Sequence, residues 1–411
     1  MKRILFIAPS SYPINGPEAM VNAKHLFLLS KAGYSVDLIC RGVRNIGNIY
    51  PTQKGVPFYF AGLNSLKVIT VDTKWNIRTL FRHLLSFLKS GYVYKASDWS
   101  LEAIRYCEDK LDLKAYDFVL TKDYPSEIVG VFLSKKYGMK WIPTWNDPYM
   151  WKKYPSPYGL GPNYKVNFIR RKLIRDIGKY SYLNLFPSAR LRDYMLSYME
   201  GMQRNRCVIM PHILLDAPSM NKTRKSGNIL RMIYAGSIGK ERNPMTFFRA
   251  LHKFLNDYPN KQIEVTFLAA IQGEFREFIN NNIKELYLDK VIHFMNPVSY
   301  EDSFKIVDGF DLCLIIEASC KEGIFLPSKL IDYLQNGKVI FTISPKEGVL
   351  SDLYNQGIVD YFADVLDEGC IYSSLIKIYD DFISNNIVRK KDLHEFELST
   401  IISLHKNVIL K

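Results

Sequence analysis

Residues 311–346 constrain the fold most, because an apolar run, a loop, a helix and a second apolar run follow one another there. DLCLIIE is a short apolar run typical of a buried strand. A loop with Gly323 and Pro327 separates it from SKLIDYLQN, whose apolar residues repeat at helical spacing. Gly337 ends that helix, and VIFTIS is the next buried strand. The stretch therefore predicts a β-α-β unit of a parallel sheet, which binds ligands at the carboxyl ends of its strands.

The same alternation extends along nearly the whole chain and predicts its domains. A chain of 411 residues exceeds one hydrophobic core, and the polar stretch 214–228 suits a linker. We therefore expect an α/β protein with two doubly wound domains, 1–215 and 216–385. We expect the final helical tract, 386–411, to return to the first domain.

The charge and the cysteines limit the class of partner and the compartment. The net charge of +14 favours an anionic partner: nucleic acid, a phosphorylated small molecule or an anionic membrane surface. Nucleic acid is the least favoured of the three, because no zinc finger, RNA-binding signature or basic tail is present. The six cysteines lack metal-binding spacing and predict a reducing compartment. Without a leader pattern or an 18-residue apolar run, the sequence predicts a cytoplasmic protein.

Residues 75–94 predict an amphipathic helix with two interpretations. Its apolar stripe either packs on its own domain, the more common arrangement, or lies in an anionic membrane surface. Trp75 and Tyr92 flank the segment, as aromatic residues do at membrane interfaces. The stripe consists of Ile77, Leu80, Phe81, Leu84, Leu85 and Leu88, and the remaining positions include Arg78, Arg82, His83 and Lys89.

Three loops carry residues suited to binding. The loop after LRMIYAG combines glycines with cations, as phosphate sites do, although a solvated charged turn has the same composition. In the 311–346 unit, Ser328 is expected to cap a helix whose N-terminus favours phosphate. Asp332, one turn further along this helix, is placed to contact a ribose. The alternative is a surface ion pair of Lys329 with Asp332. The loop 145–164 places aromatic residues beside charges, an arrangement that holds sugar rings. The candidate residues are Gly236, Ser237, Lys240 and Arg242; Ser328, Lys329 and Asp332; and Trp145, Asp147 and Tyr149.

The motifs resemble those of family-4 retaining glycosyltransferases of the GT-B fold. YPINGPEAMVNAKHLFLLSKAGYSVDLI resembles the family's N-terminal opening, TWNDPY an Arg-Asp-Pro-Trp-type loop, YAGSIGKERNP its diphosphate loop, and EGIFLPSKLIDYLQNGKVI its donor-site signature. The resemblance implies two Rossmann-like domains facing a cleft. The sequence departs from the family pattern in spacing and in residue type. Glu322 and Asp332 lie ten positions apart instead of eight, Asp332 replaces the second Glu, and Asn146 stands where Arg is usual.

The resemblance also implies a role for each matching residue. Glu322 would face the donor sugar as the catalytic residue, Asp332 would contact the ribose, and Lys240 with Arg242 would meet the diphosphate. Gly16 would lie beside the donor phosphates. The remaining donor-site positions are Gly236, Ser237, Ile324, Phe325, Leu326, Ser328 and Lys329.

The implied activity is transfer of a hexosyl-type sugar, with retention, from a UDP- or GDP-type nucleotide sugar to a glycan or lipid-linked acceptor. No cofactor is expected. No metal is expected either, because a convincing Asp-x-Asp loop is absent and cations can stabilise the leaving diphosphate. The alternatives are a nucleotide-sugar 2-epimerase of the same fold, a non-catalytic partner subunit, and a nucleic-acid binder.

Overall fold

The computed structural model describes residues 1–11, 16–43, 62–71, 76–215, 227–271, 273–387 and 393–409. The chain forms two compact units. Unit 1 comprises Met1–Lys153, Pro162–Ile213 and Leu398–Lys411, and unit 2 comprises Tyr154–Gly161 and Leu214–Glu397. Most of the expected linker and Trp75 lie outside the described residues. No described helix is long and apolar enough to cross a bilayer.

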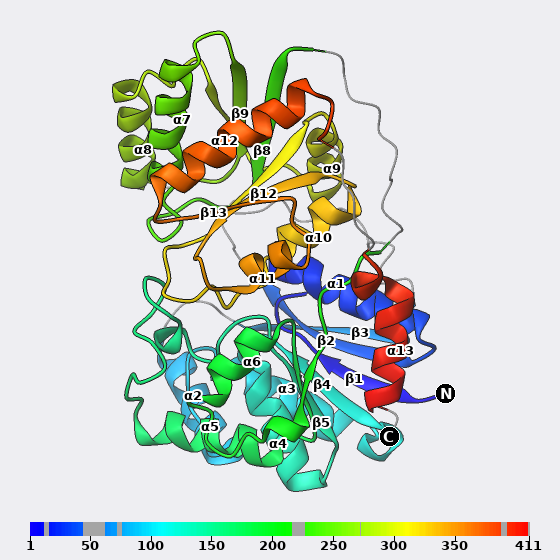
Figure 1. Cartoon of the computed structure of the whole chain (residues 1–411). Coiled ribbons are helices and arrows are strands. Elements are labelled where there is room, and N and C mark those ends of the chain that lie inside the picture. The colour runs from blue at the N-terminus through cyan, green and yellow to red at the C-terminus, as the bar shows by residue number, and fades with distance from the viewer. Residues whose placement is uncertain are drawn as a thin grey trace. The chain divides into compact units, whose positions relative to one another are not determined.

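Unit 1 is built on a seven-stranded parallel sheet with the order β3-β2-β1-β4-β5-β6-β7, of which Figure 1 labels β1 to β5. Successive strands run outward from β1 in one direction and from β4 in the other, so the strand order reverses between them. Helices α1 and α13 lie on one face and α3 and α4 on the other (Figure 1). The strands are β1 (Arg3–Ile7), β2 (Ser35–Val43), β3 (Ser65–Val71), β4 (Phe118–Lys122), β5 (Trp141–Thr144), β6 (Asn184–Phe186) and β7 (Cys207–Ile209). The helices are α1 (Pro17–Lys31), α2 (Ile77–Ser90), α3 (Ser97–Lys110), α4 (Ser126–Tyr137), α5 (Phe168–Tyr180), α6 (Ala189–Leu196) and α13 (Leu398–Ile409).

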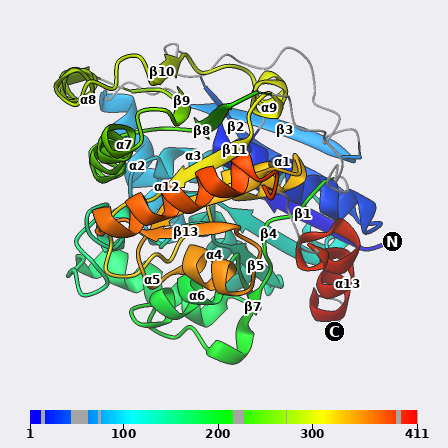
Figure 2. The same cartoon turned by 45° about the horizontal axis from the view of Figure 1, so that its top comes forward.

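Unit 2 repeats this architecture with a six-stranded parallel sheet of order β10-β9-β8-β11-β12-β13, which reverses between β8 and β11. One core, with Phe267 and Phe341 at its centre, lies under α7, α8 and α12, and α7 packs beside α12 (Figure 2). A second core around Leu330 and Ile340 lies under α10 and α11. The strands are β8 (Ile229–Ala235), β9 (Gln262–Leu268), β10 (Ile292–Met295), β11 (Leu312–Ile316), β12 (Val339–Ser344) and β13 (Tyr361–Asp364). The helices are α7 (Met245–Asp257), α8 (Gly273–Glu285), α9 (Tyr300–Asp308), α10 (Ser328–Gln335), α11 (Val349–Asn355) and α12 (Glu368–Ile383). The expected α/β class with two doubly wound Rossmann-like domains is confirmed.

The last helix, α13, belongs to unit 1 and packs against α1. His405 on α13 is fully buried, and its ring centroid lies 5.4 Å from that of Tyr34. The tract expected at 386–411 is therefore divided, because residues up to Glu397 remain with unit 2. Residues Tyr154–Gly161, expected within the first domain, also belong to unit 2.

Helix α2 buries its polar face and exposes most of its apolar stripe, the reverse of an ordinary amphipathic helix. Its small and polar residues Thr79, His83 and Ser86 are buried, whereas Ile77 and Leu88 of the apolar stripe are 84% and 70% exposed. The interpretation in which the apolar stripe packs on its own domain is therefore wrong for the described part of this segment.

Candidate functional site

The candidate site lies in unit 2 where the strand order reverses. Strand β8 leads through Gly236 into the loop that carries Arg242. Strand β11 is followed directly by Glu317, and the next helix, α10, begins at Ser328. The carboxyl ends of β8 and β11 are adjacent because these strands pair in parallel. The β8 loop, the end of β11 and the start of α10 thus deliver side chains to the crevice where doubly wound sheets bind ligands.

An ion pair joins two of these segments. The Nε atom of Arg242 lies 3.3 Å from Oε2 of Glu317, whose side chain is buried. The charge of Glu317 raises the pKa of the Arg242 guanidinium, so this cation is permanent. The guanidinium carbon also lies 5.6 Å from the centroid of the Tyr158 ring. Arg242 is therefore held by the Glu317 carboxylate and by the Tyr158 ring.

Lys329 supplies a second cation, which has no hydrogen-bond partner among the described residues. Its Nζ atom is shielded from solvent and lies 3.8 Å from the centroid of the Tyr234 ring. Burial, with Arg242 nearby, lowers the pKa of Lys329 to about 7. A buried ammonium without a partner is costly, and an anion bound beside it would relieve that cost. The alternative of a surface ion pair between Lys329 and Asp332 is wrong, because this ammonium is buried over Tyr234.

Gly236 permits the close approach of Lys329 to the β8 loop. A Cβ atom at this position would lie 2.8 Å from Nζ of Lys329, and the residue has a φ of +141°. Any larger residue would displace the ammonium or strain the backbone. The glycine that the sequence suggested for a phosphate loop therefore makes room for Lys329 in the first turn of α10.

The start of α10 and its acidic residue have definite partners. Ser328 is the first helical residue and not the expected cap; the cap position is held by Pro327, which provides no side-chain hydrogen bond. The first N–H groups of α10 thus lack a side-chain cap, as at helix N-termini that bind phosphate. Asp332 accepts a hydrogen bond of 2.8 Å from the Tyr300 hydroxyl on α9, which orients its carboxylate, and its contact with a ribose stays a prediction.

The loop between β11 and α10 lines a pocket that involves the end of β12. Two backbone hydrogen bonds join Gly323 to the loop after β12. The Gly323 N–H donates to Glu347 O at 2.9 Å, and the Val349 N–H donates to Gly323 O at 2.7 Å. Glu322 is half-buried beside this connection. Phe325 is half-buried, and its ring centroid lies 5.4 Å from that of Tyr158. The pocket is lined by Glu317, Ala318, Cys320, Gly323, Phe325, Ser344, Pro345 and Leu350.

Several expected site residues lie outside this cluster. Ile324 and Leu326 are buried in the core. Ser237 and Lys240 are exposed in the β8 loop. Gly16 precedes α1 in unit 1, where an added Cβ atom would meet no atom within 4 Å. Their roles toward a donor stay predictions.

Unit 1 has a buried charged cluster at its own point of strand reversal. Asn22 Nδ2 donates to Asp123 Oδ2 at 2.6 Å, and Asn146 donates to Glu18. Burial raises the pKa of both Glu18 and Asp123, which hydrogen-bond to each other, and burial lowers the pKa of Lys122. Asp123 also adopts a φ of +65°, which is rare for a residue other than glycine and characteristic of functional sites.

The aromatic residues expected to hold a sugar are mostly buried. Trp145 donates from its indole nitrogen to Asn184 Oδ1 at 3.1 Å, and Tyr149 packs edge-on against it at 5.5 Å. Both rings are 4% exposed, whereas Asp147 is exposed and Trp151 is 74% exposed. Trp151 is therefore a ring of this segment that is accessible to a sugar, and the acceptor-side assignments stay predictions.

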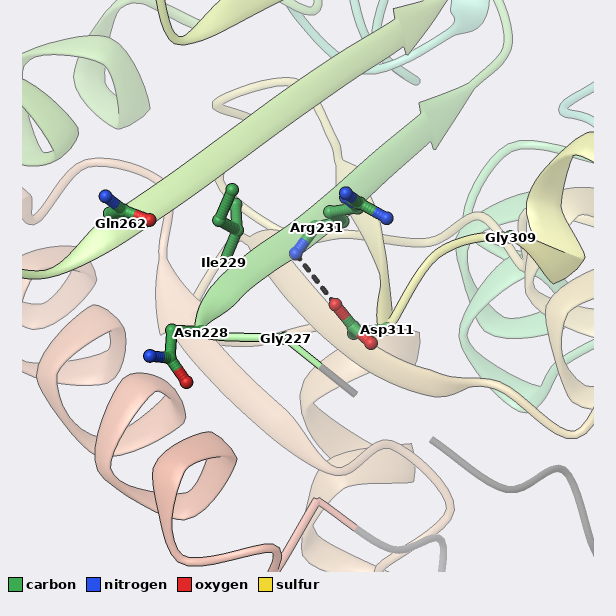
Figure 3. A pocket seen from close by; sticks show the side chains of 7 residues that line it. All are labelled: Gly227, Asn228, Ile229, Arg231, Gln262, Gly309 and Asp311. Atoms are coloured by element: carbon green, nitrogen blue, oxygen red, sulfur yellow. Dashed lines mark hydrogen bonds between the residues drawn. The ribbon is translucent and has the colours of Figure 1, made fainter. Parts of the chain in front are cut away.

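A second pocket lies at the opposite edge of the unit 2 sheet (Figure 3). It is formed where β8, β9 and β11 begin, and the Arg231 N–H donates to Asp311 Oδ2 at 2.9 Å across it. Parallel sheets bind ligands at the other edge. The cluster of Arg242, Glu317 and Lys329 is therefore the better candidate site.

The fold and the position of the site define a class, the two-domain Rossmann-like proteins of the GT-B type. No family model matches the sequence, and no curated protein matches it. Solved structures resemble it over its whole length. They include the HepE protein of Anabaena in complex with UDP and glucose (11% identity, TM-score 0.68, 100% of both chains). A sucrose-phosphate synthase from Thermosynechococcus elongatus (13% identity, TM-score 0.65) covers 100% of this chain and 97% of its own. The lipopolysaccharide outer core galactosyltransferase WaaB in its apo form (13% identity, TM-score 0.55) covers 99% of both. These neighbours are glycosyltransferases, and the chain has their GT-B fold.

The sequence patterns did not indicate the residues that pair within both clusters. Glu317 reads as the last residue of an apolar strand, and a carboxylate at the end of a buried strand was its only signal. Lys122 is likewise the last residue of β4, and Asp123 follows it directly. A charged residue at the end of a buried parallel strand, or immediately after it, is thus the signal that would have found all three.

Proposed function

We propose that this protein is a retaining glycosyltransferase that moves a sugar from a nucleotide-sugar donor to a saccharide or lipid-linked saccharide acceptor. The observation that carries the proposal is the buried ammonium of Lys329 beside Arg242, at the point of strand reversal in unit 2, with no hydrogen-bond partner in the described part of the chain. Two cations at this position suit a diphosphate. Because the HepE structure contains UDP and glucose, a uridine nucleotide sugar is the first donor to test.

The proposed chemistry uses the cations to stabilise the leaving group. As the glycosidic bond to the diphosphate breaks, negative charge grows on the departing oxygen, and Arg242 with Lys329 would stabilise it. The uncapped N–H groups of α10 would add to that effect. In this proposal Glu322 faces the sugar, Asp332 contacts the ribose, and no divalent metal is required.

The acceptor side is proposed to lie in unit 1. Burial raises the pKa of both Asp123 and Glu18, and both residues lie where a doubly wound sheet binds ligands. An acceptor hydroxyl would hydrogen-bond to this carboxyl pair. The proposed location is the cytoplasm, at the inner face of the membrane, and the proposed role is assembly of a surface glycan.

Calorimetric titration with UDP, GDP and UDP-glucose tests the donor site. We expect one uridine or guanosine nucleotide to bind, and Lys329→Met to weaken its binding by about 1.5–3 kcal/mol, the scale of a hydrogen bond to a charged group. Lys290→Met, which alters an exposed lysine of the same unit, is the matched control. The site assignment is overturned if no nucleotide binds or if both variants bind like the wild type.

Turnover tests the reaction itself. Release of UDP or GDP from a nucleotide sugar, assayed with an acceptor extract, should continue in excess chelator. Loss of turnover in chelator that is restored by Mg²⁺ or Mn²⁺ would disprove the metal-independent mechanism.

A further inference from the structure

The apolar face of α2 is held outward by the helix's own contacts. The Thr79 N–H donates to Asn76 Oδ1 at 2.9 Å, and at the other end of the helix the Gly91 N–H donates to Phe87 O at 2.7 Å. Between the ends, Nδ1 of the buried His83 lies 3.1 Å from the Ser97 hydroxyl oxygen on α3. This buried polar contact fixes the rotation of the helix, since turning α2 inward would bury apolar residues but break it.

The outward face is continuous and bordered by cations. At about 100° per residue, its exposed apolar residues occupy an arc of roughly 120°. Arg78 and Arg82 lie along one border of that arc, and neither has an ion-pair partner among the described residues. The exposed apolar residues are Ile77, Leu80, Phe81, Leu84, Phe87 and Leu88.

Further cations lie at the C-terminal end of α2. The Lys172 ammonium lies 5.2 Å from the Tyr92 ring, and the Arg170 guanidinium lies 4.4 Å from the Tyr94 ring. Both cations come from α5, whose first residue, Phe168, is also exposed. The apolar face thus has positive charge along one border and at one end.

We infer that α2 docks this protein on an anionic lipid surface, with the helix in the plane of the membrane. Leucine and phenylalanine side chains would enter the boundary between head groups and acyl chains, and Arg78 and Arg82 would contact lipid phosphates. An outward apolar face with cations at its border matches the chemistry of such a surface. The inference does not depend on the donor site.

Vesicle flotation tests this inference with the full chain. We use phosphatidylcholine vesicles with and without phosphatidylglycerol, and expect binding to the anionic vesicles to be much stronger. The double variant Leu80→Gln with Leu88→Gln should weaken partitioning by about 30-fold or more, because two largely exposed leucines no longer enter the lipid. The matched control is Leu366→Gln with Ile383→Gln in unit 2, since these residues are 72% and 50% exposed against 70% for Leu88 and 56% for Leu80.

The charge requirement is tested separately. Arg78→Gln with Arg82→Gln should cost about fivefold per cation on anionic vesicles and nothing on neutral ones, whereas Lys284→Gln with Lys290→Gln should have no effect. Far-UV circular dichroism checks that each variant is folded. Equal binding of the wild type and the leucine variant, or an equal loss in the control, overturns the inference. The inference is also overturned if the wild type does not bind vesicles but forms a dimer that the leucine variant abolishes, because the partner would then be a second copy of this chain.

Discussion

Donor binding should be coupled to uptake of a proton by Lys329. In the free protein, burial and Arg242 lower the pKa of this ammonium from 10.5 to about 7. A diphosphate bound beside it would favour the charged form and return the pKa toward its ordinary value. The ligand should be UDP-glucose, because its diphosphate is esterified at both ends and has no proton of its own that titrates near neutral pH.

The magnitude follows from the two pKa values. With a pKa of about 7, Lys329 is roughly nine-tenths charged near pH 6 and nine-tenths neutral near pH 8. Binding should therefore take up about 0.9 proton near pH 8 but only about 0.1 near pH 6. The affinity should fall about tenfold between these pH values, or about 1.4 kcal/mol.

Calorimetry in buffers of different ionisation enthalpy measures this uptake directly. Lys329→Met should bind more weakly, with no uptake and no fall in affinity between pH 6 and pH 8, and Lys290→Met should behave like the wild type. Proton uptake near pH 8 that persists in Lys329→Met would refute the reasoning, because another group would then be titrating. An affinity that does not change with pH in the wild type would refute it equally.

Three further predictions concern other residues of the two units. Glu322→Gln should lower kcat more than it lowers nucleotide affinity, because Glu322 is proposed to act at the breaking bond. Asp332→Asn should lower nucleotide affinity more than kcat, because Asp332 is proposed to contact the ribose. Measurement of kcat and Kd for both variants tests this, and the opposite pattern means that the two roles are reversed. Gly236→Ala should weaken nucleotide binding at least tenfold, because its Cβ atom would lie 2.8 Å from Lys329 Nζ; an unchanged Kd contradicts the proposed packing. Burial raises the pKa of Glu127 from 4.5 to about 8, so its stabilising contribution is present below pH 4.5 and is lost as pH rises toward 8. Glu127→Gln should therefore unfold at higher denaturant than the wild type near pH 7, by up to about 3 kcal/mol, with no gain near pH 4; equal stability near pH 7 contradicts this.

The sequence alone determined the architecture of this protein. Buried runs such as DLCLIIE and VIFTIS, separated by helices at helical spacing, leave a parallel sheet as the arrangement that buries both faces. Glycines and cations after a buried strand predicted a phosphate site in the β8 loop; Arg242 lies at the carboxyl edge of the sheet, and its role toward a phosphate stays a prediction. Such features are local, so periodicity and turn chemistry are sufficient to predict them.

Only the tertiary structure decided which residues meet. Glu317 becomes the partner of Arg242, and Lys329 comes over Tyr234, because parallel pairing of β8 with β11 brings distant loops to one edge. The orientation of α2 was likewise undetermined, since periodicity defines two faces of a helix but not which one meets the protein. That choice depends on His83 reaching Ser97 of another helix, a contact between elements that no pattern within the segment itself encodes.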